Sequence, residues 1–195
     1  MRGLRLGVLV SGSGSNLQSI IDATESGILN SHIVCVLSNK ENAYALERAK
    51  KHGIDAIYIN PKDPAYDENL LEYLKNYQVD LVVLAGYLKI IDKKLIELYK
   101  GRIINIHPSL LPKYGGKGYY GIHVHEAVLA AGETESGATV HHVDDGIDTG
   151  EIILQRSLKV KKDDTPSTLQ KRILEEIEHK ILVEAIKMLE EQIEL

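Results

Sequence analysis

Three polar residues, set in apolar or glycine-rich surroundings, could together move a proton beside a reacting carbonyl group. Asn105 and His107 belong to the apolar segment 102–108, and Asp148 lies in a carboxylate-rich turn bracketed by glycines. In a strand, residues two apart share a face, so Asn105 and His107 are expected side by side. An amide can donate to an oxyanion, and an imidazole can transfer a proton near neutral pH.

Asp148 decides between two interpretations of this pair. On their own, Asn105 and His107 could equally be buried polar residues that hydrogen-bond the following loop. A carboxylate at position 148 is costly unless it is solvated or paired, and beside His107 it would favour the imidazolium and raise the pKa of His107. We therefore predict Asn105, His107 and Asp148 as catalytic residues, without a serine or cysteine nucleophile.

A second candidate site is the glycine-rich segment 11–16, which follows the first apolar run. The dinucleotide fingerprint needs a third glycine where Leu17 stands, and the triphosphate-binding pattern is absent as well. Glycines at a helix N-terminus expose free N–H groups to an anion, which favours one small phosphate. The alternative is an ordinary strand-to-helix turn.

Other histidines invite comparison with metal sites. The candidate ligands are His123, His125, His141 and His142, with Asp144 and Asp145 nearby. Their spacing fits none of the common zinc signatures, and the first two begin a predicted helix. We therefore predict that the protein holds no metal.

Composition limits the class of protein. The chain has 195 residues and a net charge of −5, which argues against a nucleic-acid partner. Its single cysteine, Cys35, cannot form an internal disulfide, which indicates a reducing compartment. No apolar run approaches the roughly 18–20 residues that span a bilayer. We expect one domain over residues 1–195, cytoplasmic, with no membrane partner.

Apolar runs alternate with segments of helical period in the first half of the chain. Strands are predicted at 4–10, 33–37, 56–59, 81–85 and 103–106, and helices at 16–27, 43–51 and 67–77. This alternation is typical of parallel βαβ units whose sheet is covered on both faces.

The second half of the chain has a different pattern. A short helix is predicted at 124–131, strands at 137–143 and 151–158, and one long helix from about residue 166. That helix repeats apolar residues at every fourth position, which predicts one buried stripe: Leu169, Ile173, Ile177, Ile181 and Ala185. The expected fold is α/β: a single open, mostly parallel twisted sheet of Rossmann-like type with helices on both faces and antiparallel strands in the C-terminal half.

Four segments carry a resemblance to a known family: 11–18, 84–91, 105–112 and 148–150. In this order the sequence resembles the phosphoribosylglycinamide formyltransferases from residue 5 to about residue 180. The Asn-x-His-Pro-Ser-Leu-Leu-Pro block and the downstream Asp148 are similar to those of all 10-formyltetrahydrofolate transferases. The glycine-serine-asparagine loop resembles that of the phosphoribosyl branch in particular.

The resemblance implies transfer of a formyl group from 10-formyltetrahydrofolate, as co-substrate, to the primary amine of glycinamide ribonucleotide in purine synthesis. It implies that Asn105 holds the oxyanion, that His107 donates a proton and that Asp148 raises the pKa of His107. The implied partners are these small molecules only, and the chain is expected to act as a monomer or homodimer.

The resemblance also implies two groups of binding residues. The ribonucleotide would contact Gly14, Ser15, Asn16 and Glu178, with Glu178 at the glycyl amine. The folate would lie against Leu88, Lys89, Ile90, Ile91 and Asn105. Members of the family often have a basic residue where Asp63 stands here, beside Lys62, so either residue could face the folate tail. The loop 115–121 is expected to be a mobile flap that excludes water.

Two other functions compete with the transferase. A formyltetrahydrofolate deformylase would use the same three polar residues to deliver water. Such enzymes resemble this domain with a regulatory module in front, whereas the first strand is predicted here from residue 4. A non-catalytic, ligand-sensing α/β module would keep the glycine loop but has no need of all three polar residues. The sequence therefore favours the transferase.

Overall fold

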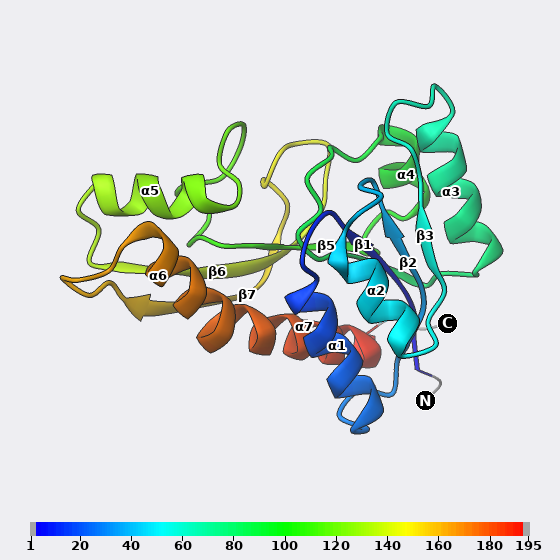
Figure 1. The fold of residues 1–195 in the computed structure, drawn as a ribbon, viewed down its shortest axis with the longest axis horizontal. Helices are drawn as coiled ribbons and strands as arrows, with labels where there is room; N and C mark the ends of the chain where they lie inside the picture. The colour runs from blue at the N-terminus through cyan, green and yellow to red at the C-terminus, as the bar shows by residue number, and fades with distance from the viewer. Residues whose placement is uncertain (1–2, 193–195) are drawn as a thin grey trace.

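The structure is a computed structural model that describes residues 3–192, and its centre is one seven-stranded sheet (Figure 1). The strands are β1 (Arg5–Val10), β2 (His32–Ser38), β3 (Ala56–Tyr58), β4 (Leu81–Leu84), β5 (Ile103–His107), β6 (Glu135–His142) and β7 (Ile152–Lys159). They lie in the order β3-β2-β1-β4-β5-β6-β7. The first five strands pair in parallel, while β6 runs antiparallel to both β5 and β7. This confirms the predicted sheet.

The helices are α1 (Ser15–Glu25), α2 (Tyr44–Lys51), α3 (Tyr66–Asn76), α4 (Lys93–Leu98), α5 (Ile122–Ala130), α6 (Pro166–Ile173) and α7 (His179–Gln192). The long C-terminal helix differs from the prediction in one respect, because a π-helical turn, η1 (Leu174–Glu178), separates α6 from α7. The end of the predicted helix, residues 193–195, lies outside the described residues. Across residues 3–192, each helix is too short or too polar to cross a membrane.

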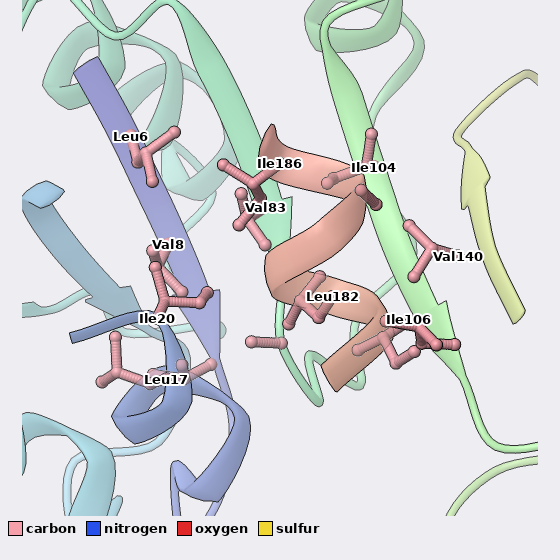
Figure 2. Close-up of a cluster of buried hydrophobic side chains, with 14 of the residues drawn as sticks. Leu6, Val8, Leu17, Ile20, Val83, Ile104, Ile106, Val140, Leu182 and Ile186 are labelled. Carbon is pink, nitrogen blue, oxygen red and sulfur yellow. The ribbon is translucent and has the colours of Figure 1, made fainter. Parts of the chain in front are cut away.

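One face of the sheet packs against α1, α2 and the C-terminal helices. Alternate residues of β1 supply it, since Leu6 and Val8 point to the same side and are fully buried. Figure 2 shows Leu182 and Ile186 of α7 lying over β4 and β5 on this face. The predicted stripe of the C-terminal helix is buried here as well, from Leu169 to Ala185.

The other face packs against α3 and α4. Leu9 of β1 joins this second core together with residues such as Leu70 and Leu95. Gly7 lies on the same side of β1, and a Cβ there would approach Leu74 and Val79 to 2.9 Å. The sheet therefore has helices on both faces, as its apolar strands required.

The strand order creates a crevice at the carboxyl end of the sheet. The chain leaves β1 to one side for β2 and β3, then returns to the other side for β4. Open α/β sheets bind ligands at such a point, where the connections from neighbouring strands diverge. The glycine-rich segment 11–16 follows β1 directly, and His107 is the last residue of β5.

We predict that Leu182→Ala lowers the free energy of unfolding by about 2–5 kcal/mol, because it opens a cavity in a fully buried layer between α7 and the sheet. Met188→Ala on the exposed side of α7 serves as the control and should change stability by less than about 1 kcal/mol. Urea unfolding monitored by circular dichroism measures both values. Equal losses in the two variants would contradict the packing described here.

Candidate active site

The turn between β1 and α1 forms a rigid wall of a cavity of about 510 Å³, hereafter the Gly14 cavity. Gly14 caps α1 in a left-handed conformation (φ 75°), and a Cβ there would lie 2.6 Å from the Cβ of Ala45. No side chain caps the N-terminus of α1, and Arg48 holds the turn by donating from Nε to the carbonyl of Ser13 (2.8 Å). Gly14, Ser15 and Asn16 all line the cavity, next to the positive end of the helix dipole.

Asn16 and Glu178 meet on one side of this cavity although 162 positions separate them in the sequence. The Asn16 amide donates from Nδ2 to Oε2 of Glu178 (2.8 Å), while its Oδ1 is buried and has no hydrogen-bond partner. Glu178 belongs to the π-helical turn, a feature often found at functional sites. Burial raises the pKa of Glu178 to about 7, and the bond from Asn16 opposes the shift. The pair therefore offers acceptor atoms to a ligand in the cavity.

Asn105 is held by a histidine that the sequence analysis did not assign to the site. Its Nδ2 lies 3.1 Å from Nε2 of His141, which is its direct partner in the β5–β6 ladder. An amide NH₂ can only donate, so Nε2 of His141 accepts and Nδ1 carries the proton that bonds the His142 carbonyl (2.8 Å). One N–H of Asn105 is thereby fixed, and the amide is oriented toward the cavities that it lines.

His107 lies between two acceptors. Its Nε2 is 2.8 Å from the carbonyl oxygen of Tyr114, which can only accept, so Nε2 carries a proton. Its Nδ1 is 3.5 Å from Oδ2 of Asp148, and this oxygen also accepts from the backbone N–H of Gly116 (3.0 Å). The structure thus brings together the three residues predicted from the sequence, with Tyr114 and His141 as additional partners.

Burial and the neighbouring carboxylate act in opposite directions on the pKa of His107. Burial lowers the pKa of His107, and this effect outweighs Asp148 and the Tyr114 carbonyl, which both raise it. Burial alone would raise the pKa of Asp148, but the contacts with His141, His107 and Gly116 together lower it. Asp148 therefore acts on the pKa of His107 in the predicted direction, but the hydration that the imidazole loses on burial lowers this pKa by more. The lowered pKa of His107 favours the neutral imidazole.

A second cavity, of about 710 Å³ and hereafter the Ile90 cavity, lies beyond Asn105. Its wall includes Leu88, Lys89, Ile90 and Ile91, all predicted to contact a folate, and Leu88 and Ile90 are exposed. The turn between β6 and β7, drawn in yellow in Figure 1, forms the opposite wall. A cavity with exposed apolar side chains and many backbone groups suits a flat heterocyclic ligand.

Lys89 does not provide a free positive charge to this cavity. Its Nζ forms an ion pair with Oδ1 of Asp67 (3.0 Å) and lies 4.4 Å from the centre of the Tyr66 ring. Lys62 and Asp63 are not among the residues that line either cavity, and Asp63 accepts from the N–H of Ala65 at the start of α3. The contact of Lys62 or Asp63 with a folate tail stays a prediction.

The two cavities meet at four residues that line both: Tyr87, Leu88, Asn105 and Tyr120. His107 faces the Gly14 cavity and Asp148 faces the Ile90 cavity. A group in one cavity can therefore reach a group in the other at Asn105. The loop 115–121 contributes to both walls, and its movement as a flap stays a prediction.

The remaining histidines do not gather around a common centre. His125 is fully buried in the wall of the Gly14 cavity, and burial, followed by the nearby His107, lowers its pKa to about 4. His123 points to Glu126 on the exposed side of α5. Within residues 3–192, no three His, Cys, Asp or Glu side chains are placed to hold a metal ion together.

A family model described as formyl transferase matches residues 4–186, and the chain belongs to this family. It is 43% identical over 187 residues to phosphoribosylglycinamide formyltransferase, chloroplastic, of Arabidopsis thaliana, covering 93% of this chain and 64% of that protein. The chain thus spans somewhat less than two thirds of the length of that relative.

Two solved structures resemble this chain over nearly its whole length. Glycinamide ribonucleotide transformylase 1 from Symbiobacterium toebii has a TM-score of 0.91 and 41% identity, with 98% of this chain and 89% of that chain covered. A formyltetrahydrofolate deformylase from Pseudomonas syringae has a TM-score of 0.88 and 26% identity, with 97% and 62% covered. Both classes of enzyme share this fold.

We predict that Glu178→Gln stabilises the protein increasingly as the pH rises. The folded protein holds the Glu178 proton more tightly than the unfolded chain does, so stability is lost as the pH rises from about 4.5 to about 7. Glutamine keeps the bond from Asn16 and does not titrate. The difference in unfolding free energy between variant and wild type should grow by about 3 kcal/mol across this window. Urea unfolding between pH 4.5 and pH 8 measures this difference in unfolding free energy. A difference that does not change with pH would contradict the burial of the Glu178 carboxylate.

Proposed function

We propose that the protein transfers a formyl group from 10-formyltetrahydrofolate to the primary amine of glycinamide ribonucleotide. The observation that carries this proposal is the meeting of two cavities at Asn105, with His107 on one side and Asp148 on the other. A transfer between two separately bound substrates needs such a shared boundary. The similarity to phosphoribosylglycinamide formyltransferases supports the same substrates.

The Gly14 cavity is the proposed ribonucleotide site. The phosphate binds the backbone N–H groups of Gly14, Ser15 and Asn16 at the N-terminus of α1, where the helix dipole favours an anion. The glycyl amine lies near Asn16 and Glu178, since the unpartnered Oδ1 and the carboxyl group can both accept its N–H bonds. These contacts hold the amine with its lone pair free to attack.

The Ile90 cavity is the proposed folate site. Leu88 and Ile90 cover the faces of the pteridine, and the backbone of segment 88–91 and of the β6–β7 turn offers donors and acceptors to its edge. Ser11 fixes this wall, because its Oγ accepts from the N–H of Leu88 (2.9 Å) and donates to Oδ1 of Asn39 (2.7 Å). The formyl group then points toward Asn105, where the cavities meet.

The reaction follows from these positions. The amine nitrogen bonds to the formyl carbon, and the carbonyl oxygen becomes an oxyanion that accepts the free N–H of Asn105. Nδ1 of neutral His107 takes the proton that the amine loses, and the resulting imidazolium lies between Asp148 and the Tyr114 carbonyl. The carbon–nitrogen bond to the folate breaks, and His107 returns the proton to the folate nitrogen.

The predictions on domain organisation, oligomeric state, location and partners extend this proposal. We infer one formyltransferase domain over residues 1–195 that acts as a monomer or homodimer in the cytoplasm. Its partners are the two small-molecule substrates, and it uses no metal, membrane or nucleic acid. The single sheet that carries both cavities supports the one-domain assignment.

The competing function is a deformylase, which would use water in place of the amine. The Asn16–Glu178 pair favours the transferase, because buried acceptor atoms at this position suit a ligand that donates N–H bonds. The deciding assay supplies 10-formyltetrahydrofolate with and without glycinamide ribonucleotide. We expect tetrahydrofolate and the formylated ribonucleotide only when both substrates are present. Release of formate at an equal rate without the ribonucleotide would support the deformylase.

We predict that His107→Ala lowers kcat by at least about 10²-fold, because it removes the group that moves the proton. His32→Ala is a matched control, since His32 is exposed at the amino end of β2, away from both cavities. Its kcat should stay within about twofold of the wild type. Near-normal turnover in the His107 variant would remove His107 from the mechanism.

A further inference from the structure

The carbonyl group that bonds His107 belongs to a residue with an anchored side chain. Tyr114 is half-buried, and its phenol OH donates to Oε1 of Glu133 (2.9 Å). Lys113 donates from Nζ to the same oxygen (2.9 Å). Glu133 itself is fixed by its backbone, because its N–H bonds the carbonyl of Val128 in α5 (3.2 Å). A chain of contacts therefore runs from α5 through Glu133 and Tyr114 to His107.

Tyr114 needs such an anchor because of its backbone. Its φ of 54° is in the left-handed region, which is unfavourable for a residue with a side chain. Gly115 and Gly116 follow it, so the chain beyond has little conformational preference of its own. The direction of the Tyr114 carbonyl therefore depends on side-chain contacts: the bond from the phenol to Glu133, and a longer bond from Oγ of Ser109 to the carbonyl itself (3.4 Å).

We propose that Glu133 is a positioning residue that acts on His107 through Tyr114. By holding the phenol, Glu133 keeps the Tyr114 carbonyl on Nε2 of His107. A neutral imidazole carries one proton, and an acceptor at Nε2 places it there. Nδ1, which lies 3.5 Å from Oδ2 of Asp148, then carries no proton and can receive one. The effect on turnover rests on the proposed function, whereas the effect on the imidazole proton does not.

The ion pair between Lys113 and Glu133 distinguishes two possible roles of Glu133. Glu133 could act through its charge alone, or by holding the phenol of Tyr114 in place. The hydrogen bond from Lys113, followed by the bond from Tyr114, lowers the pKa of Glu133. Lys113 is largely exposed, and its own carbonyl already accepts from Oγ of Ser109 (2.7 Å). Removing the Lys113 side chain leaves the bond between Tyr114 and Glu133 intact. Lys113→Met is therefore a matched control.

The kinetic test compares Tyr114→Phe, Glu133→Ala, Glu133→Gln and Lys113→Met. Loss of one neutral or charge-assisted hydrogen bond in Tyr114→Phe or Glu133→Ala should lower kcat about 3–10-fold with unchanged KM for both substrates. The double variant should lose no more than either single variant, because both remove the same contact. Glu133→Gln should restore kcat, since its amide oxygen also accepts from the phenol, and Lys113→Met should stay within about twofold.

The second test reads the imidazole directly and needs no activity. Nitrogen-15 chemical shifts of His107, measured at about pH 8 where the ring is neutral, report which nitrogen carries the proton. We expect the Nε2–H tautomer alone in the wild type, in Glu133→Gln and in Lys113→Met. Tyr114→Phe and Glu133→Ala should give a mixture of both tautomers. Wild-type shifts together with wild-type kcat in these two variants would overturn the proposal, whereas mixed tautomers in a protein without transferase activity would reject only the proposed function.

Discussion

The pairing register of β5 with β6, and of β6 with β7, determines where the candidate catalytic side chains lie. It sets Asn105 opposite His141 and His107 opposite Thr139, and it places Gln155 of β7 opposite Thr139 in turn. Thr139 then donates to the Ser109 carbonyl (2.7 Å) and accepts from Gln155 (2.9 Å), which ties the turn after β5 to the sheet. A shift by one residue would reverse these faces and separate every one of these pairs.

Most of the fold could be predicted from the sequence, because the strands and the α-helices have local causes. The burial of β1 on both faces, the glycine turn before α1 and the apolar stripe of the C-terminal helix all follow from residue type and spacing. The π-helical turn that contains Glu178 could not be predicted in this way, since it is set by packing against the rest of the chain. That turn places Glu178 beside Asn16, 162 positions away.

The site was predictable only in part, for two physical reasons. Asn105, His107 and Asp148 are polar residues where apolar or solvated ones are usual, so each is visible in the sequence. The Tyr114 carbonyl leaves no such signal because every residue has one, and His141 becomes a partner of Asn105 only through strand register. The direction of the pKa of His107 depends on how deeply the ring is buried, which spacing alone does not give.

We propose that Asn105 lies where an amine-bearing ribonucleotide and a formyl-bearing folate meet. The most direct test is a crystal structure with glycinamide ribonucleotide and an unreactive analogue of 10-formyltetrahydrofolate. We expect phosphate on Gly14–Asn16, the heterocycle against Ile90, and the formyl oxygen within hydrogen-bond distance of Nδ2 of Asn105. The claim is contradicted if both ligands occupy one cavity, or if the formyl group points away from Asn105.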